Sequence, residues 1–145
     1  MTTYDQDFYS WALEQARLLR DGHFTQVDVL NIAEELEDMG HAKERALESQ
    51  LTRLLAHLLK WHCQPEGRAW SGNSWRASIR ESRKALQKLL RKNPGLKPHL
   101  AELFDEAYDS AVNWAIAETN LPQARFPVAC PWTLEQAIDE EFWPP

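Results

Sequence analysis

The stretch "LESQLTRLLAHLLKWHC", residues 47–63, decides the fold because its apolar side chains recur at the spacing of one helix face. Leu47, Leu51, Leu54, Leu58 and Trp61 are separated by four, three, four and three residues. This heptad-like spacing places all five on one side of an α-helix and is typical of a helix at the centre of a bundle. The stretch therefore predicts a long helix, over about 41–63, that packs against several others.

The rest of the chain has the same helical period. Further helices are expected at about 7–20, 25–39, 74–92, 98–119 and 134–141. Gly22, Gly40 and the "NPG" at 93–95 are the expected stops, and Thr25 and Thr133 are the expected N-caps. No segment alternates at period two. The sequence predicts an all-α fold over 1–145: a single-domain antiparallel helical bundle of about five main helices plus a short C-terminal one, with about 70% helix.

Composition narrows the class of protein. The 145 residues hold seven Trp, and the net charge is −6. The two cysteines lack metal or redox spacing, and no segment is apolar enough for a signal peptide or a membrane span, so a cytoplasmic protein is expected. Residues 68–92 carry eight basic side chains against one acidic side chain. Because the whole chain is acidic, nucleic-acid binding is disfavoured and would have to be local to that segment.

Five segments, taken in order, resemble a known family. They are "DFYSWALEQARLLRDGHF", "VDVLNIAEELEDMG", "LTRLLAHLLKWHCQPE", "SWRASIRESR" and "FPVACPWTLEQAIDEEFWP". Together they are similar to the bacterial domain of unknown function 29 family, from about Asp7 to Pro144. The resemblance implies a compact all-α protein. It implies no activity, cofactor or site residue.

Metal chemistry finds little support in the spacing of ligand-type residues. His57 and His62 are five apart, roughly 140° around a helix, and His62 and Cys63 are adjacent and diverge. No Glu-x-x-His pair for a dimetal centre is present. The sequence therefore predicts no metal site and no cofactor.

A polar cluster of Glu35, His57 and Arg80 is one candidate site. Glu35 borders the apolar face of its predicted helix, and a half-buried carboxylate needs a partner or a raised pKa. Paired with His57 or an arginine, it is either structural or catalytic. The structural reading is favoured.

A row of arginines is the second candidate. Arg76, Arg80 and Arg83 are spaced i, i+4, i+7 on one helix stripe and could bind an anion. The favoured alternative is that acidic side chains of neighbouring helices, at 34–38 and 102–109, pair with this row inside the molecule.

Three tryptophans precede this row in the sequence. Trp61, Trp70 and Trp75 are expected to pack together at the corner between two helices. Phe142 and Trp143 are expected to dock on the bundle or on a second subunit.

Two classes of function follow, with a third weaker one. The leading class is a non-enzymatic helical interaction module that binds a protein partner or forms a homo-oligomer. The alternative is a small enzyme or ligand-binding protein with an interhelical pocket near Glu35, His57 and Arg80. The weaker one is nucleic-acid binding through the row of Arg76, Arg80 and Arg83, together with Lys84.

Overall fold

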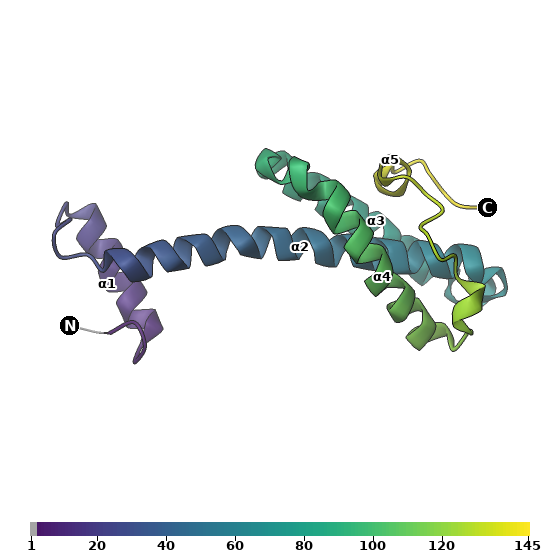
Figure 1. Cartoon of the computed structure of the whole chain (residues 1–145), viewed down its shortest axis with the longest axis horizontal. Helices are drawn as coiled ribbons and strands as arrows, with labels where there is room; N and C mark the ends of the chain where they lie inside the picture. The colour runs from purple at the N-terminus through teal and green to yellow at the C-terminus, as the bar shows by residue number, and fades with distance from the viewer. Residues whose placement is uncertain (1–2) are drawn as a thin grey trace. The chain divides into compact units, whose positions relative to one another are not determined.

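The computed structural model describes residues 3–145, of which 77% are helical, and no strand occurs among them. The predicted all-α class is therefore confirmed. The α-helices, drawn in Figure 1, are α1 (Phe8–Arg20), α2 (Val29–Cys63), α3 (Arg68–Lys92), α4 (Leu100–Thr119) and α5 (Leu134–Ile138). Short 3-10 helices lie at Pro65–Gly67, Pro94–His99 and Gln123–Arg125.

Two compact units divide the chain. The first ends at Ala42, and the second covers Lys43–Pro145. Helix α2 contributes to both, since it begins at Val29 and ends at Cys63. The single-domain organisation stays a prediction, and each unit is described by itself below.

The expected helix end at Gly40 is wrong. Gly40 lies inside α2, so the two helices expected at 25–39 and 41–63 are one, and residues 3–145 form four long α-helices and one short one. A glycine inside a helix costs only about 1 kcal/mol, which the surrounding helix formers outweigh. Gly22, the expected stop after α1, differs from Gly40 in its backbone. It has φ 78°, a left-handed conformation that favours glycine and does not continue a helix.

Asp28, rather than the expected Thr25, precedes the first turn of α2. The Asp28 carboxylate accepts from the side-chain amide of Asn31 at 2.8 Å and from the indole N–H of Trp11 at 3.1 Å. Its backbone N–H donates to Gln15 Oε1 at 2.7 Å. Trp11 and Gln15 are both buried. The start of α2 is therefore bonded to α1 within the first unit.

The corner between α2 and α3 also differs from expectation. Helix α3 begins at Arg68 instead of 74, directly after the 3-10 turn, so most of the expected loop is helical. Trp75 is buried, but Trp70 is 74% exposed. The expected packing of Trp70 against Trp61 and Trp75 is therefore wrong.

The hydrophobic core lies in the second unit. The four leucines of the quoted stripe, Leu47, Leu51, Leu54 and Leu58, have no exposed surface, as their spacing predicts. They pack with residues of α3, α4 and the C-terminal segment, including Ile79, Leu86, Phe104, Ala107, Ala111, Phe126 and Trp132. Thr133 and Gln136 form the predicted capping box at the start of α5.

Candidate functional site

The members of the predicted arginine row lie near two different tryptophan rings. The Arg76 guanidinium lies 5.3 Å from the Trp61 ring and donates to Asn73 Oδ1 at 2.7 Å. The guanidinium groups of Arg80 and Arg83 lie 5.9 Å and 5.5 Å from the Trp143 ring. The row therefore does not present three free guanidinium groups on one exposed face, and only Arg80 and Arg83 share a neighbour.

Trp61 and Trp143 join this row to the C-terminal segment. Their ring centroids are 5.6 Å apart, and the Trp61 indole donates to the Pro144 carbonyl oxygen at 3.0 Å. Arg68 lies over Trp61 at 4.4 Å. Such cation–π contacts contribute about 0.5–2 kcal/mol each, more when water is excluded. Aromatic and backbone partners thus hold the arginines, where carboxylates of neighbouring helices were expected.

Arg83 is the most unusual member because its side chain is wholly buried. Its Nε donates to the Ala137 carbonyl oxygen of α5 at 2.8 Å. Nη1 and Nη2 have no hydrogen-bond partner among residues 3–145. Burial lowers the pKa of Arg83, while the nearby charges of Asp139 and Glu140 act in the opposite direction.

A pocket of about 310 Å³ opens at this point of the second unit. Its lining combines three basic side chains, two acidic ones and an aromatic ring: Arg80, Arg83, Lys84, Glu140, Glu141 and Trp143. Sequence spacing indicated Arg80 and Arg83. It missed Glu140 and Glu141, because the residues that follow α5 approach α3 only in the folded chain.

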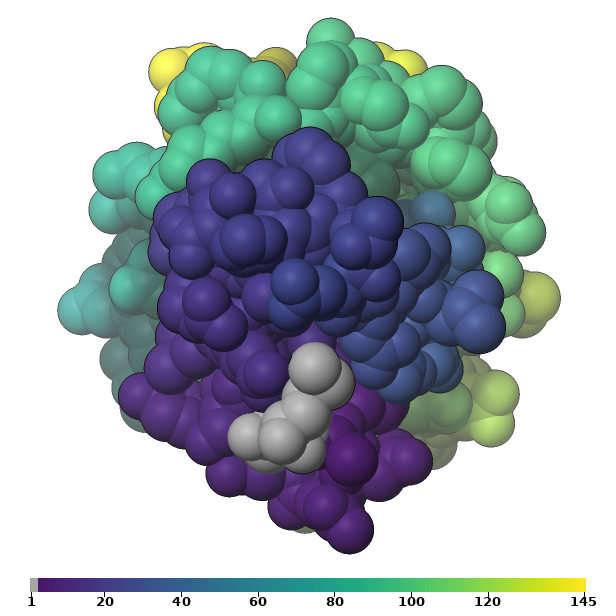
Figure 2. Space-filling view, turned by 90° about the vertical axis from the view of Figure 1, so that its left-hand side faces the viewer, coloured from purple at the N-terminus to yellow at the C-terminus, as the bar shows by residue number. Residues whose placement is uncertain are grey.

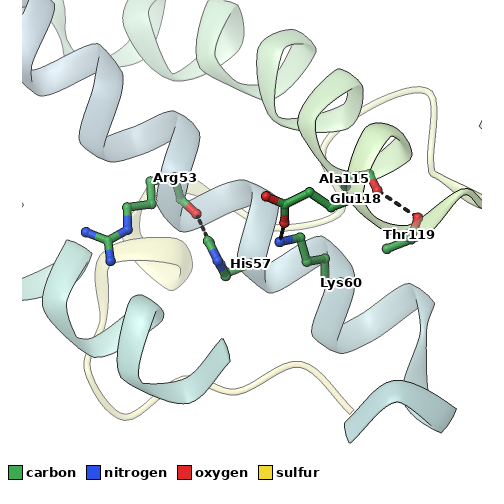
Figure 3. Close-up of polar contacts among 6 residues, drawn as sticks. All are labelled: Arg53, His57, Lys60, Ala115, Glu118 and Thr119. Carbon is green, nitrogen blue, oxygen red and sulfur yellow. Dashed lines mark hydrogen bonds and ion pairs between the residues drawn. The ribbon is translucent and has the colours of Figure 1, made fainter. Parts of the chain in front are cut away.

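His57 has a different setting in the second unit. Its Nδ1 lies 2.8 Å from the Arg53 carbonyl oxygen, and Figure 3 shows the two groups facing each other. The ring packs edge-on against Trp114 at 5.8 Å, and burial lowers the pKa of His57. His57 and Arg80 therefore have separate neighbours.

Glu35, the third member of the predicted polar cluster, belongs to the first unit. It accepts a hydrogen bond from the Tyr4 hydroxyl. This bond raises the pKa of Tyr4 to about 12. The sequence did not indicate Tyr4, because a contact between residues 31 positions apart leaves no local pattern.

Lys60 is a charged residue that the sequence analysis did not single out. Its side chain is 4% exposed, and its amine donates to Glu118 of α4, whose side chain is 50% exposed (Figure 3). Burial lowers the pKa of Lys60 to about 8. The pair joins α2 to α4 inside the second unit.

The residues considered for a metal have other contacts. His62 Nδ1 lies 3.2 Å from the Pro145 carbonyl oxygen, and its ring packs against Trp132. Cys63 is a free thiol whose pKa is raised by burial. Within 3–145, no three His, Cys, Asp or Glu side chains are grouped so that they could hold a metal ion.

No helix in the described part of the chain is both long enough and apolar enough to cross a membrane.

The fold and the pocket define an all-α protein in which tryptophans and arginines hold the C-terminal segment against α2 and α3.

Residues 3–143 match the family described as Domain of unknown function DUF29, and the chain belongs to that family. The family's function is, as its description says, unknown. No curated protein and no solved structure matches the chain.

Proposed function

We propose that the protein is a non-enzymatic helical interaction module whose first unit docks a partner protein with a basic, apolar surface. The observation that carries this proposal is the exposure of large apolar side chains. Among residues 3–145, eleven such side chains are exposed, and nine of them lie in the first unit. These nine are Phe8, Tyr9, Leu13, Leu19, Phe24, Val29, Leu30, Leu36 and Met39.

The first part of α2 carries an apolar row with the spacing of a helix-pairing face. Val29, Ala33, Leu36 and Gly40 are separated by four, three and four residues, and all four are exposed. The same spacing continues in Leu47, Leu51 and Leu54, which are buried in the second unit. Small residues at two of the four positions permit a close approach by another helix. We call Val29, Ala33, Leu36 and Gly40 the docking row; Figure 2 views the first unit, with α1 in purple and the start of α2 in blue.

Large exposed apolar patches on soluble proteins mark interaction sites. Val29 and Leu36 are 63% and 61% exposed, and Leu30 beside them is 84% exposed. Covering a side chain of this size stabilises a complex by about 1.5–3 kcal/mol when burial is complete. A few such anchors supply the affinity of an ordinary interface.

Charge selects the kind of partner. Residues 3–42 hold two arginines against nine carboxylates. A symmetric pairing of this face with a second copy would bring two strongly acidic surfaces together. A partner with basic side chains around an apolar strip would complement both the acidic charge and the exposed apolar row of the first unit. Opposite charges guide the encounter, and apolar contacts stabilise the complex.

Capture from an extract of the natural host tests the proposal with matched variants. Leu36→Asp and Leu30→Asp place a charge in or beside the docking row, while Val128→Asp changes an exposed apolar residue of the second unit. We expect a basic protein that wild type and Val128→Asp retain equally. Both first-unit variants should reduce its retention about tenfold or more, the effect expected of a lost interface anchor.

Two results would contradict the proposal. One is retention that is equal for all four proteins. The other is a stable homodimer, seen by sedimentation of the purified chain, that Leu36→Asp dissociates, because the face would then serve self-association.

A further inference from the structure

The pocket of the second unit contains a buried arginine whose donor atoms are only partly used. Nε of Arg83 is fixed by the Ala137 carbonyl oxygen at 2.8 Å. Nη1 and Nη2 are buried and have no hydrogen-bond partner within residues 3–145. The guanidinium group is therefore oriented, Arg83 is one of the residues that line the pocket, and its two terminal nitrogens have unused hydrogen bonds.

Buried donors without partners are costly, and more so when they carry charge. Asp139 and Glu140 are near enough to act on Arg83 through their charge. Neither forms a hydrogen bond or an ion pair with it among the described contacts. The two nitrogens therefore have no acceptor among the described residues.

The other residues that line the pocket suit a small anion, including one with a planar ring. Arg80 and Lys84 add two positive charges, and the Trp143 ring adds a planar apolar wall. Glu140 and Glu141 also line the pocket, so its net charge is only slightly positive. A volume of about 310 Å³ is at the small end of the range for ligand pockets.

We propose that this pocket binds a small molecule through an oxyanion, either a carboxylate or a phosphate group, that accepts from both Nη1 and Nη2 of Arg83. Arginine's planar fork fits both groups with two parallel hydrogen bonds. Arg80 and Lys84 strengthen the binding from the rim. The site lies entirely in the second unit and is independent of the docking row.

Titration of the full chain with inorganic phosphate and with benzoate tests this proposal. The two probes distinguish a phosphate from a flat carboxylate, and sodium chloride keeps the ionic strength constant. The readout is the NMR resonance of the Arg83 Nε–H group together with that of the Trp143 indole N–H. We expect both resonances to move saturably with at least one probe, with a Kd of about 10 mM or below.

Two variants with opposite expected effects make the test independent of folding. Arg80→Gln removes a positive charge from the rim and should weaken binding about fivefold. Glu140→Gln removes a competing carboxylate and should strengthen binding by a similar factor. Arg91→Gln changes an exposed arginine of α3 outside the pocket and should leave the Kd unchanged. Arg83→Met should abolish the shifts while the rest of the spectrum stays folded.

Three results would overturn the proposal. The first is the absence of saturable movement of the Arg83 and Trp143 resonances with either probe. The second is the same response to chloride alone, which would be an effect of ionic strength. The third is an equal Kd for wild type, Arg80→Gln and Glu140→Gln.

Discussion

Lys60 shows how burial changes the chemistry of one residue. The amine is almost inaccessible, and burial lowers its pKa from 10.5 to about 8. The Glu118 carboxylate favours the charged form, but it is half exposed, so burial has the larger effect. A buried ion pair of this kind often adds little stability compared with apolar side chains of similar size.

The pH dependence of stability tests this account of Lys60. Between pH 8 and 10.5 the unfolded chain binds more protons at this residue than the folded chain, so stability rises with pH in that window. The free energy of unfolding of wild type, relative to Lys60→Met, should increase by about 1–2 kcal/mol from pH 7.5 to pH 9.5. Urea unfolding at the two pH values measures it.

The comparison with Lys60→Met isolates one group. Both proteins retain Cys63, Cys130 and Tyr108, whose pKa values are raised and which titrate at alkaline pH. Parallel pH profiles for the two proteins would show that Lys60 keeps its ordinary pKa.

Gly67 occupies a position where a single methyl group is too large. A Cβ atom there would lie 2.6 Å from Cη2 of the buried Trp75 ring and 3.1 Å from Gln64 Oε1. Gly67→Ala should therefore destabilise the protein by about 1–3 kcal/mol, as overpacking of a rigid side chain does. Thermal unfolding measures the change.

Gly95→Ala is the matched control for that change, because nothing lies within 4 Å of a Cβ at Gly95. Its effect should stay within about 0.5 kcal/mol. Equal melting temperatures for the two variants would contradict the close contact between Gly67 and Trp75.

Contacts such as these could not be predicted from the sequence. Lys60 and Glu118 are 58 positions apart, and Arg83 and Ala137 are 54 apart. Helical periodicity assigns a residue to a face, but the partner opposite that face depends on how the helices pack. The favoured prediction paired Arg83 with acidic side chains of neighbouring helices, whereas its Nε donates to the Ala137 carbonyl oxygen of α5.

At the scale of elements, α2 shows where sequence patterns succeed and where they fail. The spacing of Leu47, Leu51, Leu54 and Leu58 gave the buried face of the helix correctly. Glycine gave contradictory signals, because Gly22 has a left-handed conformation and Gly40 a helical one. The sequence alone does not distinguish a glycine that ends a helix from one inside a helix. The outcome depends on whether the residues after the glycine continue the helix.

Substitutions at Gly40 test the continuity of α2. No atom lies within 4 Å of a Cβ at this position, so Gly40→Ala should stabilise the helix by about 0.5–1 kcal/mol. Gly40→Pro should destabilise it by about 3 kcal/mol, because proline lacks the N–H and clashes with the preceding turn. Hydrogen exchange of the amides at 36–46 measures both changes. Equal protection in the proline variant and wild type would mean that the helix ends at Gly40.

At the scale of the whole molecule, the distribution of exposed apolar residues follows the two units. The second unit buries its stripe, and two of its large apolar side chains, Trp70 and Val128, are exposed. The first unit buries Trp11 and Leu18 but exposes nine. The sequence predicted an interaction module from the lack of catalytic motifs. It could not show which part of the apolar pattern along α2 is buried and which part is exposed.

Native mass spectrometry of the protein purified from its own host tests the central proposal most directly. We predict a complex of this chain with a second, basic protein, and we predict that Leu36→Asp yields the free chain while Val128→Asp keeps the complex. A homo-oligomer, or a free chain in all three preparations, would contradict the proposal that the first unit docks a basic partner protein.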